Sequence, residues 1–244
     1  MFWAGAGPLA FTARGPVRTV GRMAFFSGGD GTGALRFSVL GVPVAIAPTF
    51  WLVTLLLSLG RLGALELLVE WVVVVLVSIL VHEMGHALVA RRFEQSVWVE
   101  LHGMGGSAYY DGRTALTSGQ RIQVALAGPL AGVALGAVVY AGAWLVPPES
   151  ALLDSAVRDA LWVNWGYGLL NLLPILPLDG GHVMQELVDG VTQQRNHPAA
   201  YVVSLVAAVG LLVVSLQVGF SGGLFLIGWL IFHNLQNATV TERA

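Results

Sequence analysis

One stretch decides the fold, and from residue 65 to residue 93 it reads LELLVEWVVVVLVSILVHEMGHALVARRF. Its apolar part is long enough to cross ~30 Å of hydrocarbon, for which a helix needs roughly 20 residues. Three ionisable side chains, His82, Glu83 and His86, nevertheless lie inside this apolar run. Ionisable groups in a membrane span are rare and costly, so we expect these three to serve a function.

The composition of the whole chain agrees with a membrane location. Of 244 residues, 56% are hydrophobic and 11% are charged, with a mean hydropathy of +0.74, whereas a soluble domain has about 25% charged residues. The net charge of −2 favours no nucleic acid as a partner. Cysteine is absent, so any metal has to be bound by His, Asp or Glu.

The apolar runs predict an all-α polytopic membrane protein with about six transmembrane helices. The predicted spans are residues 48–60, 65–91, 120–146, 156–173, 199–218 and 222–237. The first is short for a full crossing.

The charge pattern predicts an orientation and three parts of the chain. Residues 1–35 read as a flexible cytosolic N-terminal tail without a signal peptide, residues 36–190 as a catalytic membrane core, and residues 191–244 as a C-terminal transmembrane hairpin. Arginines gather in the tail and in the loop after residue 91, whereas the loop after the third span is mostly acidic. Because cytoplasmic loops are rich in Lys and Arg, we expect a multi-pass protein of the cell membrane with both termini in the cytosol.

A small β-hairpin or sheet is expected between the second and third spans. Val97, Val99 and Leu101 alternate with polar or aromatic residues, and a glycine-rich turn follows at residues 103–106. The alternative is an interfacial loop rich in Trp and Tyr. The segment FSVLGVPVAIA, residues 37–47, is also better read as strand than as helix.

Residues 82–86 read HEMGH, which is the pattern H-E-x-x-H on a helix. Residues four apart share one helix face, so His82 and His86 can bind one tetrahedral zinc ion. Glu83 would lie beside the metal and move a proton between water and a leaving amine. Two satisfied helix histidines are the alternative, but the bilayer setting argues against it.

Zinc in a catalytic site needs a third protein ligand and an open fourth position. Asp179 is favoured because Pro174 and Pro177 break the helix before it, and broken helix at membrane depth has to line a cavity or be buried in protein. The candidates are Glu94, Glu100, His102, Asp179, His182 and Glu186.

Two motifs together resemble the site-2 protease family of intramembrane zinc metalloproteases. That family has H-E-x-x-H and N-x-x-P-x-x-x-x-D-G, and the second motif matches here from Asn171 to Gly180. Residues 127–132, AGPLAG, are similar to the third-span signature of the family. The resemblance covers roughly residues 37–190 and indicates a compact member without PDZ or CBS domains.

The resemblance implies one Zn²⁺ ion bound by His82, His86 and Asp179, with Glu83 as the catalytic base. It also implies that Asn171 binds the backbone of a membrane-anchored protein substrate in or beside the lipid bilayer. We add Gly103 and Gly105 as substrate-binding positions, because an unpaired hairpin edge can add the substrate as a further strand. The oligomeric state stays open.

Two other functions use the same residue types. Intramembrane His and Asp also build ion pathways, so a divalent metal-ion transporter is an alternative. A catalytically inactive membrane adaptor is another. Glu83 favours the protease, because a hydrolase needs it and a transporter does not.

Overall fold

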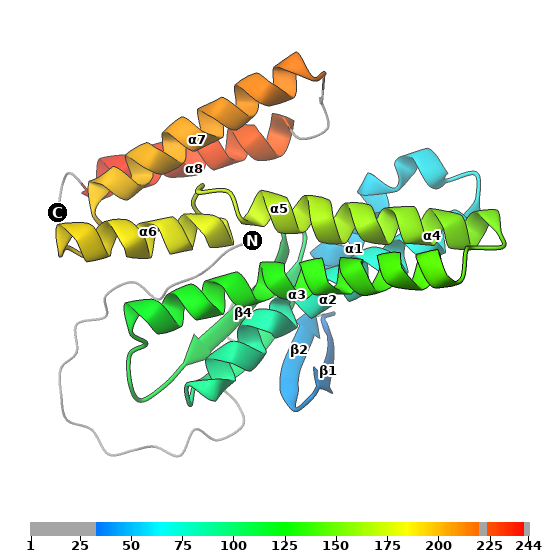
Figure 1. Ribbon diagram of the computed structural model, residues 1–244, viewed down its shortest axis with the longest axis horizontal. Helices are drawn as coiled ribbons and strands as arrows, with labels where there is room; N and C mark the ends of the chain where they lie inside the picture. The colour runs from blue at the N-terminus through cyan, green and yellow to red at the C-terminus, as the bar shows by residue number, and fades with distance from the viewer. Residues whose placement is uncertain (1–32, 220–223, 242–244) are drawn as a thin grey trace.

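The structure is a computed structural model that describes residues 33–219 and 224–241, and most of the predicted tail lies outside these residues. Figure 1 shows a mostly helical chain with one small sheet. The strands are β1 (Leu35–Val39), β2 (Val42–Ile46), β3 (Ser96–His102) and β4 (Gly105–Asp111). The helices are α1 (Pro48–Leu57), the short η1 (Leu59–Arg61), α2 (Leu65–Arg92), α3 (Ser118–Leu145), α4 (Ala151–Leu161), the π-helical η2 (Trp162–Tyr167), α5 (Gly168–Asn171), α6 (Asp179–Thr192), α7 (Pro198–Gln217) and α8 (Leu224–Thr241).

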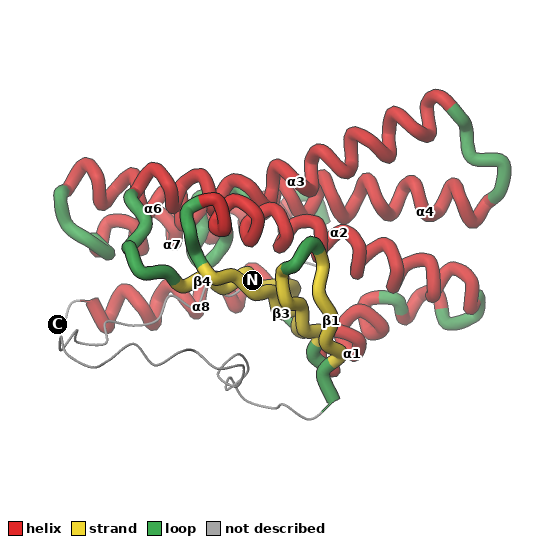
Figure 2. The backbone as a smooth tube through the Cα atoms, turned by 90° about the horizontal axis from the view of Figure 1, so that it is seen from below, coloured by secondary structure: helices red, strands yellow, loops and turns green. Residues whose placement is uncertain are grey.

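The sheet is mixed, with strand order β1-β2-β3-β4. The hairpins β1–β2 and β3–β4 are antiparallel, and β2 pairs with β3 in parallel, with Val44 opposite Val99. The expected hairpin between the second and third spans is therefore present. Residues 37–47, expected as one strand, instead belong to two strands, β1 and β2, with a turn at Leu40 and Gly41, and β2 extends the hairpin into a sheet. Figure 2 places the strands next to α2.

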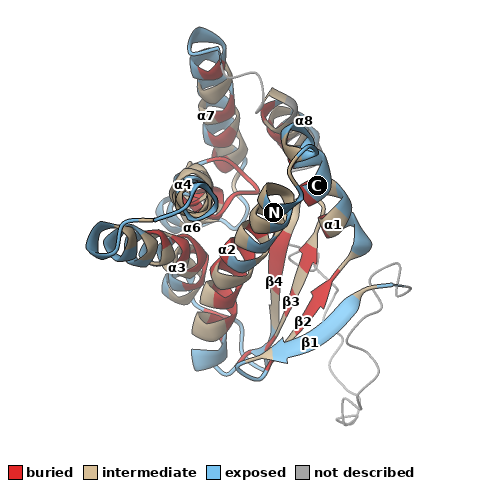
Figure 3. Ribbon diagram, turned by 90° about the vertical axis from the view of Figure 1, so that its right-hand side faces the viewer, coloured by how far each residue is buried: buried red, intermediate tan, exposed pale blue. Residues whose placement is uncertain are grey.

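The core lies between this sheet and α2. Val44, Val99 and Leu101 are fully buried, and they pack with Val75 and Met84 from α2. Figure 3 shows the buried inner strands facing α2, while β1 is exposed at the outer edge. Apolar alternation along β3 thus fixes which face of the sheet meets α2.

Within the described residues, three helices are long and apolar enough to cross a membrane: Leu65–Arg92, Ser118–Leu145 and Pro198–Gln217. These match the second, third and fifth predicted spans. The first predicted span forms α1, a helix of 10 residues, which is about 15 Å long at 1.5 Å per residue. The fourth predicted span corresponds to the end of α4, η2 and α5, and α4 carries Asp154, Arg158 and Asp159.

The helices α7 and α8 pack on each other and cover the turn that leads into α6. Ile175 and Leu178 of this turn form an apolar cluster with Ala208 of α7 and Leu230 of α8. The second half of the turn, residues 175–178, is therefore buried in protein, as a break in a helix at membrane depth requires.

Candidate metal centre and its surroundings

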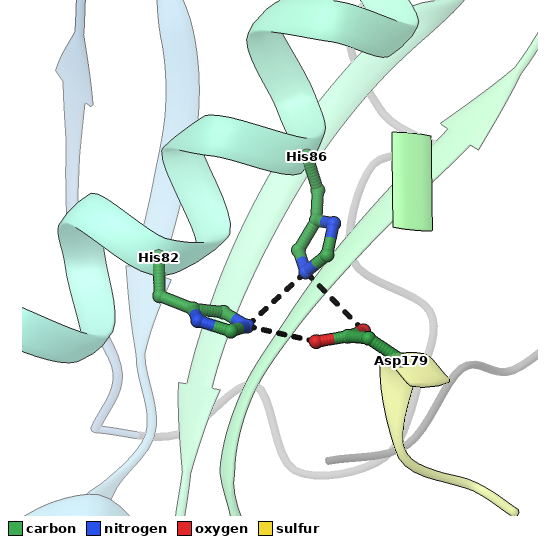
Figure 4. A group of neighbouring side chains, drawn as sticks. All are labelled: His82, His86 and Asp179. Carbon is green, nitrogen blue, oxygen red and sulfur yellow. Dashed lines mark hydrogen bonds and ion pairs between the residues drawn. The ribbon is translucent and has the colours of Figure 1, made fainter. Parts of the chain in front are cut away.

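His82 and His86 point from one face of α2 toward Asp179 at the start of α6 (Figure 4). All three residues are 1% exposed. The His82 and His86 Nε2 atoms lie 3.2 Å apart, His82 Nε2 lies 3.1 Å from Asp179 Oδ2, and His86 Nε2 lies 3.4 Å from Asp179 Oδ1. Within the described residues, these three are the group that could hold a metal ion.

The spacing of these atoms fits a tetrahedral metal. Ligand atoms at 2.0–2.1 Å from a tetrahedral zinc ion lie about 3.3 Å from one another, which agrees with the three distances in the protein. The Asp179 Oδ1 atom is buried and has no hydrogen-bond partner among the described residues. A cation would satisfy this oxygen and would separate the two imidazole nitrogens, so the residues fit the metal that the motif implies.

The orientation of His86 is fixed from the far side of its ring. Its Nδ1 atom lies 2.6 Å from the Val124 carbonyl oxygen of α3. A carbonyl only accepts, so Nδ1 carries the proton and donates it, which leaves the Nε2 lone pair facing the site. Gly128 makes room for the ring, because a Cβ there would lie 2.1 Å from His86 Nε2.

Glu83 lies beside the three side chains and against the strand β4. It is 1% exposed, and its Oε1 atom has no hydrogen-bond partner among the described residues. A Cβ on Gly106 would lie 2.4 Å from Glu83 Cγ, and the Ala108 backbone amide interacts with the carboxylate. The Glu83 carboxylate therefore lies against β4 of the hairpin.

The residues predicted to bind substrate lie in different places. Asn171 ends α5, is 1% exposed, and neither polar atom of its side chain has a hydrogen-bond partner among the described residues. Gly103 is directed elsewhere, because its N–H donates to Thr49 Oγ1 of α1 at 3.2 Å. Gly105 has a φ of +119°, a backbone conformation that glycine adopts readily and that the turn between β3 and β4 uses. The glycine that contacts Glu83 is Gly106, which the sequence argument passed over.

Other candidate ligands are engaged away from the site. His102 bonds to Ser107 Oγ at 3.0 Å and accepts from the Met104 N–H at 3.2 Å, and burial lowers its pKa to about 4. Glu186 accepts two hydrogen bonds from Arg121, one of them at 2.8 Å. Burial alone would raise the pKa of Glu186, but these bonds hold it below its usual value.

Two residues near the site, one aromatic and one polar, were not predicted from the sequence. The Tyr167 ring meets the His82 ring edge-on at 5.4 Å between centroids. Asn164 donates to Ser78 Oγ and to the Ala160 carbonyl, both at 2.8 Å. Both belong to the π-helical η2, and such segments often occur at functional sites. No periodic pattern in the sequence marks a π-helix, so no available signal pointed to them.

Comparison with known proteins agrees with this site. A family model for peptidase family M50 matches residues 70–161 and 149–215, together more than half of the chain. Rip3 of Mycobacterium tuberculosis, named as a zinc metalloprotease, is 31% identical over 226 residues, covering 82% of this chain and 56% of Rip3. Stage IV sporulation protein FB of Bacillus subtilis is 29% identical over 143 residues, covering 58% of this chain and 46% of that protein.

A solved structure shares the fold. The site-2 protease from Methanocaldococcus jannaschii superposes with a TM-score of 0.54 at 21% identity, covering 86% of this chain and 94% of that chain. The chain spans little more than half the length of Rip3. With the family match extending over both histidines and Asp179, this chain belongs to peptidase family M50.

Proposed function

We propose that this protein is an intramembrane zinc metalloprotease that hydrolyses peptide bonds in or next to transmembrane segments of membrane-anchored substrates. The observation that carries the proposal is the convergence of His82, His86 and Asp179 at 3.1–3.4 Å with Glu83 beside them, all buried. The names of Rip3 and of a zinc metalloprotease of Methanocaldococcus jannaschii, 25% identical over 160 residues, support zinc as the metal.

The three side chains would hold one zinc ion and leave a fourth position open. Zinc bound there would supply Lewis acidity and make water reactive near neutral pH. Glu83 would accept a proton on its unpartnered Oε1 and return it to the leaving amine. The Val124 carbonyl would keep the Nε2 atom of His86 free of protons throughout.

The substrate would bind as an added strand along β4. Within the described sheet β4 pairs only with β3, so no strand occupies its other side. Hydrolysis requires an extended chain, and the freed backbone groups cost several kcal/mol each in hydrocarbon unless they are paired. An added strand would lie beside Glu83, because Gly106 and Ala108 of β4 contact this residue. Asn171 could bind the same backbone with its amide.

The strand β3 offers no edge to a substrate. Its residues Val99 and Leu101 lie between β2 and β4, which pair with β3 on either side. The N–H of Gly103 already donates to Thr49 Oγ1 of α1, so Gly106 is the glycine that the proposal places beside the substrate. A proline that blocks the edge therefore belongs on β4.

We also propose that the chain crosses the membrane six times, with both termini in the cytosol. We propose the same three parts as above: a tail of residues 1–35, a catalytic core of residues 36–190 and a C-terminal transmembrane hairpin of residues 191–244. The three long apolar helices supply three crossings. The crossing at α1 is the shortest, because this helix is about 15 Å long against ~30 Å of hydrocarbon. Its support is the exposure of Leu52, Leu56 and Leu57, which suits lipid contact. The lipid bilayer and a membrane-anchored protein are then the partners.

The decisive experiment compares wild type with Glu83→Gln. Both proteins should hold about one zinc ion each, and only wild type should cleave a fluorescein-labelled unstructured protein in detergent. An active Glu83→Gln variant would exclude the proposed base. A zinc-loaded wild type that never cleaves would favour the transporter or the adaptor, which the family match does not favour.

A further inference from the structure

The peptide groups of Leu176, in the turn before Asp179, are held by the last two helices. The Leu176 N–H donates to Ser204 Oγ of α7 at 2.7 Å. Its carbonyl accepts from Asn234 Nδ2 of α8, also at 2.7 Å. Ser204 is 0% exposed and Asn234 is 1% exposed, so both bonds are made in the interior.

These two bonds pair the N–H and the carbonyl of Leu176, which lies outside any helix or strand. The chain between α5 and α6 is neither helix nor strand, and Pro174 and Pro177 lack an N–H group. The other N–H groups of residues 172–178 bond to nearby carbonyls, whereas that of Leu176 bonds to Ser204. Away from water, a backbone group without such a partner is costly. Burying a polar side chain in an apolar helix such as α7 or α8 also costs free energy. Here the two polar side chains, Ser204 and Asn234, both bond to the backbone of Leu176.

The opposite side of the turn presses on the two glycines that follow Asp179. A Cβ on Gly181 would lie 2.4 Å from the Ile175 carbonyl carbon and 2.5 Å from the Leu176 nitrogen. A Cβ on Gly180 would lie 2.2 Å from the Leu172 carbonyl oxygen. Backbone segments packed this closely cannot move independently, so a shift of Leu176 displaces Gly181 and, with it, Asp179.

We propose that Ser204 and Asn234 are positioning residues for the metal centre. By bonding to Leu176 from α7 and α8, they keep the turn packed against Gly180 and Gly181. This packing holds the Asp179 carboxylate close to both histidines. This inference rests on the metal role proposed above for Asp179. It gives the C-terminal helices a share in metal affinity, in addition to any part in anchoring the chain.

The test measures zinc affinity of the purified full chain in detergent by competition with a fluorescent chelator. Loss of a direct hydrogen-bond partner of a metal ligand weakens binding about 10–100-fold. Ser204 and Asn234 act on Asp179 through Leu176, so we expect the lower end, about 10-fold, for Ser204→Ala and for Asn234→Ala. Ser204→Thr keeps the hydroxyl acceptor and should restore most of the affinity. In protein that already carries Asp179→Ala, adding Ser204→Ala should cause no further loss, because the effect passes through Asp179.

Ser215→Ala is the matched control, since Ser215 is on the same helix and is also buried, at 5% exposure. It should bind zinc within threefold of wild type. Wild-type affinity in both alanine variants, or an equal further loss in the Asp179→Ala protein, would overturn the inference while the proposed function stands. A wild-type protein that binds no zinc would instead remove the proposed function. If Ser204→Ala does not fold, Ser204→Cys weakens the same acceptor, and unchanged affinity there counts against the inference.

Discussion

Gly106→Ala should disable the proposed base without disturbing the metal. The three atoms nearest to the added Cβ all belong to Glu83, with Cγ at 2.4 Å and Oε1 at 2.6 Å. Carbon atoms in contact lie ~3.5–4.0 Å apart, so the carboxylate has to retreat by about 1 Å. A displacement of this size can lower a rate about 10²-fold.

The assay pairs turnover of a labelled unstructured protein with zinc content by mass spectrometry. We expect turnover to fall about 10²-fold while about one zinc ion per chain is retained, because a 1 Å error at the reacting groups costs that much. The backbone of Gly106 is not in the positive-φ region, so alanine adds no backbone strain. Gly142→Ala is the control, as nothing lies within 4 Å of its added Cβ. Turnover within threefold of wild type, or loss of zinc together with activity, would refute the reasoning.

Three further outcomes are expected. Gly85→Ala places a Cβ 2.4 Å from the Ala127 carbonyl oxygen of α3, and because backbone cannot yield, unfolding should become easier by about 1–3 kcal/mol in a thermal melt; an unchanged melting temperature would contradict the α2–α3 packing. Burial lowers the pKa of His102 to about 4, whereas a histidine in the unfolded chain has a pKa of about 6.5. Stability that depends on neutral His102 is therefore complete above pH ~6.5, and it falls by up to about 1.4 kcal/mol per pH unit as the pH drops toward 4. His102→Asn should show a shallower loss of melting temperature between pH 7 and pH 5, and an equal slope would count against this role. A cysteine replacing Glu149 in this cysteine-free chain should react with an impermeant reagent only from outside the cell, and labelling only from the cytosol would reverse the orientation.

The sequence predicted the centre of the site better than its surroundings. His82, Glu83 and His86 follow from the period of one helix, and Asp179 follows from two prolines that break a helix in an apolar setting. Their convergence was expected, whereas their roles as ligands and base stay predictions for the zinc measurements above.

What the sequence could not predict depends on contacts through space. The parallel pairing of β2 with β3 joins segments separated by the whole of α1 and α2, and no local pattern encodes it. For the same reason the sequence could not show which strand of the hairpin lies at the edge, and Gly106 could not be told from its glycine neighbours. Ser204 and Asn234 lie 28 and 58 residues from Leu176, and each looks like an ordinary polar residue in an apolar helix.

The parallel pairing of β2 with β3 sets an order for biosynthesis. About 50 residues separate the two strands, which takes a ribosome roughly 3 to 10 seconds at 5–20 residues per second. During this interval β2 has only β1 as a neighbour, and the sheet can close only after α2 has been made and has entered the bilayer. Asp179, and then Asn234, follow later still. A nascent chain that fails to insert α2 therefore lacks the helix that packs on the sheet and carries His82 and His86, so the sheet core and the candidate metal centre depend on the same insertion step.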